Sequence, residues 1–197
     1  MCNFTRTLKD KTGNAIVYIL NSTGGIGKTK ILKLLYLMEY TMAKNYCSPF
    51  LGLPFEVWRL GPVQKDIYVD LSSGLSIFGD YITSECVNGN VIFLPVKEFD
   101  DSEFSDIEIN VMDSVICKYG EIKTRDLIEM LHQKGFLWYE SAVKNHLLES
   151  FNDNTATTSG VSIDFRDAIT RESDKEEYTD CLAIRHTAES MSIGAYV

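Results

Sequence analysis

Residues 28–64 constrain the fold more than any other part of the sequence, because a helical pattern there is followed directly by a strand pattern. In the first half, apolar residues recur at spacings of three and four and therefore share one side of a helix: Ile31, Leu34, Leu35, Met38 and Met42. Charged residues fall largely on the other side: Lys30, Lys33, Glu39 and Lys44. The helix should end near residue 46, since Pro49 follows. We expect the rest of the fold to pack against this helix.

Short β-strands are predicted at two places. Residues 55–58 alternate apolar and polar side chains, and the run stops at Gly61-Pro62 because proline cannot donate to a sheet ladder. Asn88-Gly89 separates two β-prone runs, residues 82–87 and 90–96, which predicts a hairpin with a type I′ turn. An isolated hairpin is only marginally stable, so residues 55–60 are the natural third strand. Residues 161–165 are a candidate for the sheet edge.

Helices are predicted for most of the remaining chain. Residues 10–20 are compatible with a strand or a helix, and we favour a helix with Asp10 as its N-cap. Ser105 and Glu108 have the spacing of a capping box in a helix over residues 100–119. The other predicted helices cover residues 65–71 with Pro62 at the start, a segment that begins at residue 124 and stops at residue 135, residues 139–149 and residues 172–191. The predicted fold class is therefore α+β, mainly α-helical, with a small antiparallel sheet of about three strands that includes the Asn-Gly hairpin.

Length and composition predict one main domain. The 197 residues are expected to form a domain over residues 1–150 and an acidic C-terminal extension over residues 151–197 that packs on or flanks it. The N-terminus lacks the pattern of a signal peptide, and no run approaches the roughly 18 apolar residues that cross a membrane. The five cysteines are odd in number and contain no C-x-x-C pair, which is typical of a reducing compartment. We therefore predict a cytoplasmic protein without membrane contact.

Charge is distributed unevenly along the chain. The net charge of −9 divides into +5 over residues 1–60 and −14 over residues 61–197. An acidic surface disfavours binding to a phosphate backbone and suits a basic protein partner. Solubility alone is the simpler explanation of the same asymmetry.

Several motifs occur in an order typical of one family. They are Lys-x-x-Lys-Leu-Leu-Tyr at residues 30–36, Val57-Trp58-Arg59-Leu60 followed by Gly61-Pro62-Val63 and Tyr68, and Lys118-Tyr119-Gly120 followed by Leu127, His132 and Trp138. Over residues 10–142 the chain resembles the Panacea domain, also described as the SocA-type antitoxin domain. It departs from that pattern at Leu37, where the family more often has an aromatic residue.

The resemblance implies an antitoxin that neutralises a cognate toxin by direct protein–protein binding, and not an enzyme. We expect the toxin to have a basic surface, and a protease or a chaperone is a further candidate partner. Trp58 lies beside the Gly-Pro turn, where a partly exposed tryptophan would suit an interface, although each tryptophan would also suit the core. The candidate partner-binding residues are Trp58, Arg59, Gln64, His132, Trp138, Glu176 and Glu177.

Residues 23–29, TGGIGKT, support an alternative function. They look like the phosphate loop of P-loop ATPases, in which the backbone of Gly27, the side chain of Lys28 and the hydroxyl of Thr29 would hold a nucleotide and magnesium. However, Ser22 stands where the first glycine of that motif belongs, and no second aliphatic strand ends in a metal-binding aspartate. Our main prediction therefore includes no cofactor.

Other functional classes lack a complete set of residues. The three histidines do not pair at a spacing of four, so no metal site is predicted. No serine occupies a G-x-S-x-G elbow, and Cys117 with His132 is better explained as a buried thiol and a backbone-bonded histidine. The helices around Gly120 resemble a helix-turn-helix, but Asp126 and Glu129 with one arginine suit a phosphate backbone poorly. DNA binding with autorepression is therefore the least supported class.

Overall fold

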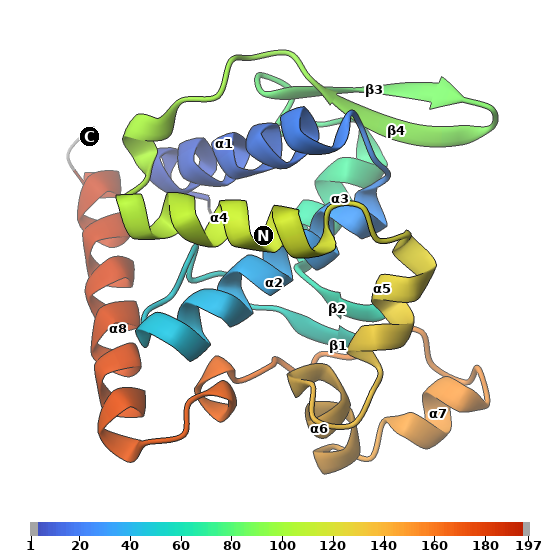
Figure 1. The fold of residues 1–197 in the computed structure, drawn as a ribbon, viewed down its shortest axis with the longest axis vertical. Helices are drawn as coiled ribbons and strands as arrows, with labels where there is room; N and C mark the ends of the chain where they lie inside the picture. Colours follow the sequence, from blue (N-terminus) through green and yellow to red (C-terminus); the bar gives the residue numbers. More distant parts are fainter. Residues whose placement is uncertain (1–3, 195–197) are drawn as a thin grey trace.

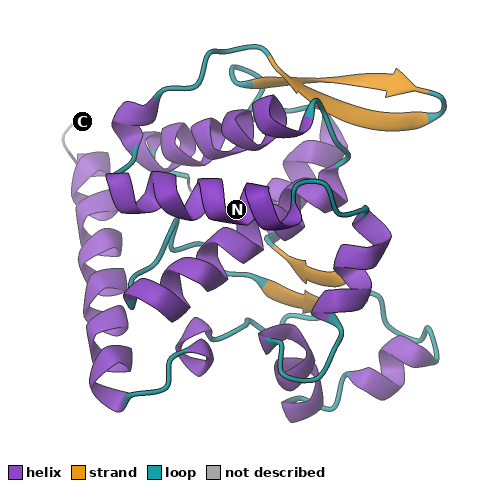
Figure 2. Ribbon diagram, viewed as in Figure 1, coloured by secondary structure: helices purple, strands orange, loops and turns teal. Residues whose placement is uncertain are grey.

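The computed structural model describes residues 4–194, which form eight α-helices and two two-stranded antiparallel sheets (Figures 1 and 2). The predicted fold class, α+β and mainly helical, is confirmed. Residues 1–3, which include Cys2, and residues 195–197 lie outside the described residues. They are the ends of the predicted segments 1–150 and 151–197. The elements in chain order are α1 (Arg6–Thr23), α2 (Lys28–Tyr46), β1 (Glu56–Trp58), β2 (Gly61–Val63), α3 (Lys65–Ser73), β3 (Ile82–Val87), β4 (Asn90–Pro95), η1 (Asp101–Glu103), α4 (Asp106–Tyr119), α5 (Thr124–Leu131), α6 (Leu137–Lys144), α7 (Leu148–Asn152), η2 (Phe165–Ala168) and α8 (Glu172–Gly194).

Helix α2 is the centre of the molecule, as its sequence pattern predicts. Every residue from 31 to 39 is buried, and α1, α3, α4, α5, β2, β4 and η2 all contact the helix. Figure 1 shows α1 and α4 on one side of α2 and the β1–β2 hairpin on the other. The expectation that Lys33 and Glu39 lie on an outer face is wrong, because both side chains are buried. Leu32, Tyr36 and Leu37 extend the apolar surface around the helix, which is the pattern of a helix buried on all sides.

Buried carboxylates fix two irregular loops. Glu39 accepts hydrogen bonds from the backbone N–H groups of Phe50 and Leu51, each at 2.9 Å, and of Gly52 at 3.2 Å. Asp70 accepts from the N–H groups of Ile77 at 2.7 Å and of Phe78 at 3.1 Å. In each case a carboxylate on a helix replaces the backbone partners that a loop lacks.

The predicted three-stranded sheet is wrong, because the strands form two separate hairpins. The Asn88-Gly89 hairpin is confirmed as β3–β4, with positive φ at both turn residues as a type I′ turn requires. Strand β1 pairs instead with β2, where Gly61 at φ 95° lets the chain reverse. The backbone also pairs β1 with residues 161–163 on its other edge. This confirms the expected place of that segment at a sheet edge.

Pro62 occupies a strand position that tolerates proline. It lies opposite Val57 in the β1–β2 register, and the N–H of Val57 donates to the carbonyl of Val161 on the opposite edge, at 2.9 Å. Neighbouring residues of a strand direct their backbone groups to opposite edges. The Val57–Pro62 pair therefore exchanges no backbone hydrogen bonds, and the missing N–H of proline costs none.

Several helix boundaries differ from those predicted. Helix α1 begins at Arg6 with Thr5 as N-cap instead of Asp10, and α3 begins at Lys65 after Gln64 caps it, so Pro62 does not open a helix. The capping box of Ser105 and Glu108 is confirmed at the start of α4. The predicted helix over residues 139–149 is divided into α6 and α7, and the one over residues 172–191 is α8.

Residues 151–194 pack against the same core as the preceding chain. The ring of Phe165 contacts Tyr36 and Phe55, with centroid distances of 5.6 and 6.0 Å. Arg185 on α8 donates to the carbonyl of Phe50 at 2.5 Å and lies 3.4 Å from Glu108. The acidic C-terminal part is thus anchored through α2, the residue 49–54 loop and α4, while the division into two segments stays a prediction.

Replacing Leu35 by alanine should lower the free energy of unfolding by about 2–5 kcal/mol, because the side chain is fully buried at the centre of α2 and its loss leaves a cavity. Urea unfolding followed by circular dichroism measures this change. Val69→Ala, at a half-exposed position of α3, is the matched control and should change stability by no more than about 0.5 kcal/mol. Equal stability of the two variants would contradict the central role of α2.

Candidate functional site

Four of the predicted partner-binding residues converge on the turn of the β1–β2 hairpin. The indole Nε1 of Trp138 donates to the carbonyl of Trp58 at 2.9 Å, and the His132 Nε2 lies 2.9 Å from the carbonyl oxygen of Arg59. The His132 and Trp138 rings are in contact, with centroids 3.8 Å apart. The end of α5 and the start of α6 therefore hold the backbone of the hairpin turn through these two side chains.

The predicted residues differ in how far they reach solvent. Trp138 and Gln64 are each 1% exposed, and Gln64 Oε1 accepts the Ile67 N–H at the start of α3, at 2.6 Å. These two side chains serve the fold in this conformation. Trp58 and Arg59 are half-buried, and Leu60 at the tip is 52% exposed. We define the hairpin tip as Trp58, Arg59 and Leu60.

Trp58 is held at the edge of a cluster of polar and aromatic groups. Its indole Nε1 donates to Glu56 Oε2 at 2.7 Å, and its ring meets the ring of Tyr68 edge-on, with centroids 5.0 Å apart. The ammonium of Lys28 lies 4.7 Å from the centroid of the same Tyr68 ring. The tip is thus backed by α2 and α3.

Beneath the hairpin tip lies a pocket of about 140 Å³ that we call the Lys33 pocket. The residues that line it are Thr29, Leu32, Lys33, Trp58, Arg59, Leu60, Val63, Tyr68, Thr157 and Thr158. None of them is acidic. The pocket therefore combines apolar walls with the side chains of two cationic residues.

Lys33 is the residue that the sequence interpretation missed. Its side chain is 1% exposed, and its Nζ donates to the carbonyl oxygen of Pro62 at 2.8 Å. Burial lowers the pKa of Lys33 to about 7. The Cβ that any other residue would bring to position 61 would lie 2.9 Å from Lys33 Cε, so Gly61 leaves room for this side chain. The apolar residues on both sides of Lys33 in the sequence, Leu32 and Leu34, were the available signal.

Arg59 is only partly paired. Its Nη1 donates to Asn154 Oδ1 at 2.6 Å, and its backbone N–H donates to Thr157 at 3.0 Å. Its Nε is buried and has no hydrogen-bond partner within the described residues. A buried unpaired donor is costly, so this nitrogen is a candidate contact for an acceptor group that enters the pocket.

The glycine-rich segment lies between two helices. Gly24 at φ 71° caps the C-terminus of α1, and α2 begins at Lys28, so a helix precedes the loop where a P-loop requires a strand. Ile26 forms a bridge with Phe93 of β4, and a Cβ at Gly25 would lie 2.7 Å from the Leu94 side chain. Close packing against β4 therefore explains a glycine here.

Gly27, Lys28 and Thr29 do line a cavity of about 640 Å³. Lys28 Nζ donates to Ser72 Oγ at 2.9 Å within it. This lysine is thus already engaged with α3 through both Ser72 and Tyr68.

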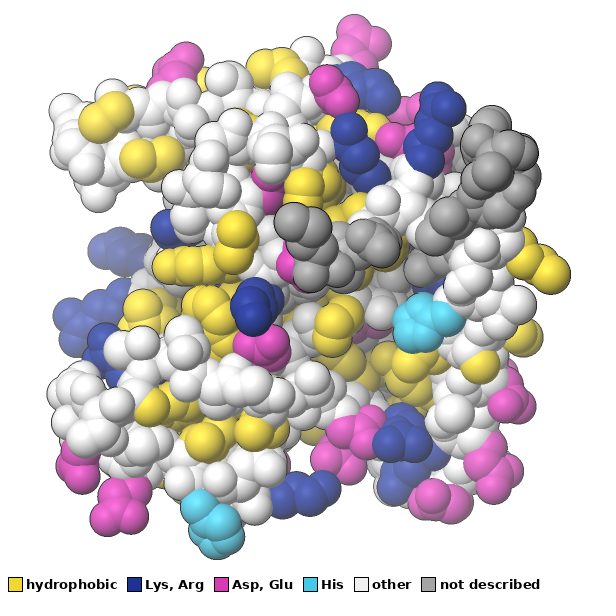
Figure 3. Space-filling view, turned by 180° about the vertical axis from the view of Figure 1, so that it is seen from behind, with side chains coloured by type: hydrophobic (Ala, Val, Ile, Leu, Met, Phe, Trp, Pro, Cys, Tyr) yellow, Lys and Arg dark blue, Asp and Glu magenta, His cyan; other side chains and the backbone are white. Residues whose placement is uncertain are grey.

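Glu176 and Glu177 lie exposed on α8, which Figure 1 shows along the left edge of the molecule, apart from the β1–β2 hairpin right of the centre. Acidic side chains gather over the N-terminal end of this helix, at the lower right of Figure 3. Glu172 and Asp174 in this group pair with Lys175 and Arg171 of the same chain, at 3.2 and 2.9 Å. The structure therefore separates the exposed Glu176 and Glu177 from the partly exposed Trp58, Arg59 and His132, while Gln64 and Trp138 are buried.

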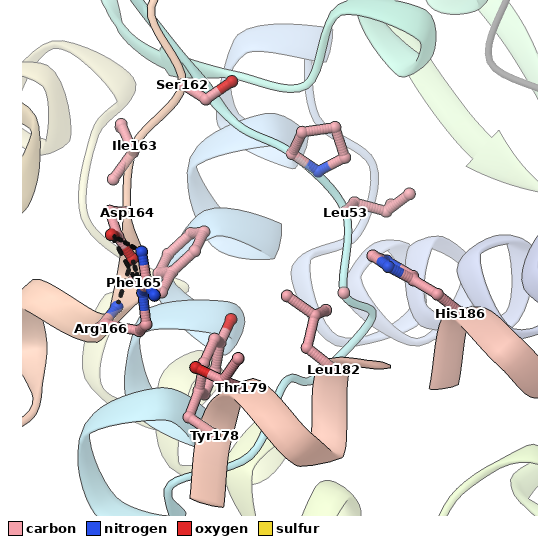
Figure 4. Close-up of a pocket in the computed structure, with 12 residues that line it drawn as sticks. Leu53, Ser162, Ile163, Asp164, Phe165, Arg166, Tyr178, Thr179, Leu182 and His186 are labelled. Carbon is pink, nitrogen blue, oxygen red and sulfur yellow. Dashed lines mark hydrogen bonds and ion pairs between the residues drawn. The ribbon is translucent and has the colours of Figure 1, made fainter. Parts of the chain in front are cut away.

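A third cavity, of about 570 Å³, lies between α8 and the segments 52–54 and 162–166. In Figure 4, Tyr178, Leu182 and His186 of α8 face Leu53 and Ile163 across it. Arg166 pairs with Asp164 at its edge, at 2.7 Å. Burial raises the pKa of the Tyr178 hydroxyl in its wall.

Other candidate sites gain no support from the geometry. Within residues 4–194 no cluster of three His, Cys, Asp or Glu residues could hold a metal ion, and no helix is long and apolar enough to cross a membrane. Cys117, expected to be buried, is exposed on α4, and both ring nitrogens of His132 lie within 2.9 Å of carbonyl oxygens. On α5, the exposed side chain of Arg125 pairs with Glu129 at 2.9 Å.

Comparison with known proteins identifies one relationship. A family model described as antitoxin SocA-like, Panacea domain, matches residues 31–139. No curated protein and no solved structure matches the chain. The matched region begins within α2 and ends within α6, and it includes the β1–β2 hairpin and Lys33.

Lys28→Ala should leave the free energy of unfolding within about 0.5 kcal/mol of the parent, because Lys28 makes only surface contacts. Calorimetry with ATP and magnesium should show no heat of binding to either protein. A micromolar dissociation constant that is lost in Lys28→Ala would instead establish a nucleotide site in residues 23–29.

Lys33→Met should stabilise the protein below pH 7, because the parent must there bury a charged ammonium without an acidic partner. Between pH 7 and about 10 the unfolded lysine holds a proton that the folded one has released, so the stability of the parent rises with pH. The advantage of the variant should therefore shrink by about 1.4 kcal/mol for each pH unit in that range.

Urea unfolding at pH 6, 7.5 and 9 measures this difference. The control is Lys44→Met, which removes an exposed lysine from the same helix and should give no such slope. A pH-independent difference for Lys33→Met would mean that Lys33 keeps its proton in the folded protein throughout this range.

Proposed function

This chain belongs to the antitoxin SocA-like, Panacea domain family, and we propose that it neutralises a cognate toxin protein by binding it directly. The family match over residues 31–139 is the observation that carries the proposal. An antitoxin of this kind acts by stoichiometric binding, so we assign no catalytic turnover and no cofactor to the chain. The pairing takes place in the cytoplasm, where unpaired thiols stay reduced.

We assign the main contact to the hairpin tip. Tryptophan and arginine are enriched among residues that dominate binding energy, and such residues sit next to pockets from which water is excluded. Trp58 and Arg59 combine this chemistry with partial exposure, and Leu60 adds an exposed apolar side chain. His132 and Trp138 contribute by holding the backbone of the turn in place.

The acidic end of α8 has a second role, which is to attract a basic toxin. Glu176 and Glu177 are exposed and lie apart from the hairpin tip. Exposed charges of this kind raise the association rate and favour partners of opposite charge, and they add less to the strength of the final complex. The proposed partner is therefore a toxin with a basic surface facing α8.

Co-expression with the product of the adjacent gene tests direct neutralisation. We expect cell growth to be rescued and the two proteins to co-purify as a complex of fixed stoichiometry. Leu60→Asp should weaken this complex at least about tenfold, because it places a charge at the centre of the contact. Val96→Asp, a charge at an exposed aliphatic position outside the hairpin tip, should not. Rescue of growth without any detectable complex would rule out direct neutralisation.

The double variant Glu176→Gln/Glu177→Gln should slow association with this partner at low salt, and the difference from the parent should vanish as salt rises. The physical reason is that exposed charges are screened over about 8–10 Å at physiological ionic strength. Stopped-flow or surface-based kinetics measure the rate. The matched control is Glu85→Gln/Glu98→Gln, which removes the same charge from exposed positions in and near the β3–β4 hairpin. Equal slowing in both double variants would show that net charge, and not the α8 surface, controls the rate.

A further inference from the structure

We propose that the Lys33 pocket binds a carboxylate, and that in the toxin complex this carboxylate belongs to an aspartate or glutamate side chain of the toxin. The second half of the proposal rests on the proposed function, whereas the first half does not. This site is separate from the charge attraction at α8, because it depends on one buried side chain beneath the hairpin tip.

The buried ammonium of Lys33 has fewer acceptors than donors. An ammonium offers three hydrogen-bond donors, and the structure gives it one acceptor, the carbonyl of Pro62 at 2.8 Å. Within the described residues no salt bridge joins Lys33 to a carboxylate. A cation that is 1% exposed and lacks an anion is unusual, since buried charges in proteins are generally paired.

Arg59 provides the second, independent observation. Its Nε is buried without a partner, and the residue lines the same pocket as Lys33. The hydroxyl-bearing residues Thr157 and Thr158 also line it, and no acidic residue does. Two incompletely paired cationic side chains around one cavity favour an anion that can accept several hydrogen bonds, as a carboxylate does.

The size of the pocket limits the ligand. Its volume of about 140 Å³ is well below the roughly 300–1,000 Å³ of typical small-molecule and cofactor sites. It is suited to the head of one side chain. Trp58 and Leu60 line the pocket and belong to the hairpin tip, so a side chain reaching Lys33 would bring its own backbone against the proposed contact surface. A protein carboxylate therefore fits better than a free metabolite.

Binding of a carboxylate should be linked to the proton on Lys33. The charged or titratable groups around the site are Glu56, which accepts from the Trp58 indole, and Arg59 from the hairpin, together with His132 from the end of α5, Tyr68 from α3 and Lys28 from α2. Because the pKa of Lys33 is about 7, its amino group is largely uncharged above that pH when no ligand is bound. A carboxylate restores the charged form, so its binding takes up a proton and its affinity should fall by about tenfold per pH unit above pH 7.

The first experiment titrates the full chain with N-acetyl-aspartyl amide, and with N-acetyl-asparaginyl amide as the uncharged control. The readout is the NMR resonance of the Trp58 indole N–H, identified by comparison with Trp58→Phe. We expect saturable shifts with the aspartate probe alone, at least tenfold weaker in Lys33→Met and in Arg59→Gln, and unchanged in Lys44→Met. Equal responses to the two probes, or no response to either, would overturn the carboxylate site. Arg59→Gln keeps the test valid if Lys33→Met does not fold.

The second experiment identifies the source of the carboxylate, using the complex with the product of the adjacent gene. We expect Lys33→Met and Arg59→Gln to weaken this complex at least tenfold, and N-acetyl-aspartyl amide to compete with its formation. Full-strength complexes of both variants, together with an intact response to the probe, would overturn the assignment to a toxin side chain and leave a site for free carboxylates. Absence of any complex with the parent chain would reject the proposed function, and the assignment to a toxin side chain with it, while the first experiment would still decide whether the pocket binds a carboxylate.

Discussion

The rest of the structure depends on one constraint, which is that α2 is buried on all sides together with two of its charged residues, Lys33 and Glu39. A helix buried over residues 31–39 needs neighbours around its whole circumference, which is why helices, both hairpins and a 3₁₀ turn all contact it. Apolar neighbours alone would leave Lys33 and Glu39 without partners, at a cost of several kcal/mol per buried charge. The segment between α2 and α3 supplies those partners from its backbone. Phe50, Leu51 and Gly52 donate to Glu39, and Pro62 accepts from Lys33.

The two buried charges differ in how fully they are satisfied. Glu39 accepts three backbone hydrogen bonds, and the nearby Arg185 favours its charged form, although burial still raises its pKa. Lys33 has one carbonyl and no carboxylate partner within the described residues. The hydrogen bonds of Glu39 are therefore made within the fold, whereas the ammonium of Lys33 retains unused donors. This difference is the physical reason to treat Glu39 as a structural residue and to propose a binding role for Lys33, although both lie on the same helix and are equally buried.

Local signals in the sequence predicted the elements that depend on local interactions. The extent of α2, the Asn88-Gly89 hairpin and the capping box at Ser105 all follow from spacing or from turn chemistry within a few residues. The pairing of β1 with β2 was missed because Pro62 was expected to end the strand, whereas the N–H of Val57 faces residues 161–163 and the opposed proline costs no ladder hydrogen bond. The burial of Lys33 was missed because a helical projection assigns lysine to solvent, whereas tertiary packing closes that face. The Lys33 pocket forms only when the hairpin and the loop carrying Thr157 meet, so no single stretch of sequence contains it.

The two proposed surfaces divide binding into separate physical tasks. The region matched by the family model contains α2 from residue 31 onward, the hairpin tip and Lys33, whereas the acidic end of α8 lies beyond it. A desolvated charge pair in a pocket opposes dissociation, because separating it leaves both charges without partners until water returns. Exposed acidic residues instead act before contact, over distances set by screening, and so control how often partners meet. Under the proposed function, a chain that holds its toxin at the hairpin tip and the Lys33 pocket could therefore change its choice of partner through α8 without rebuilding the buried site, since exposed positions of α8 lie outside α2 and its loops.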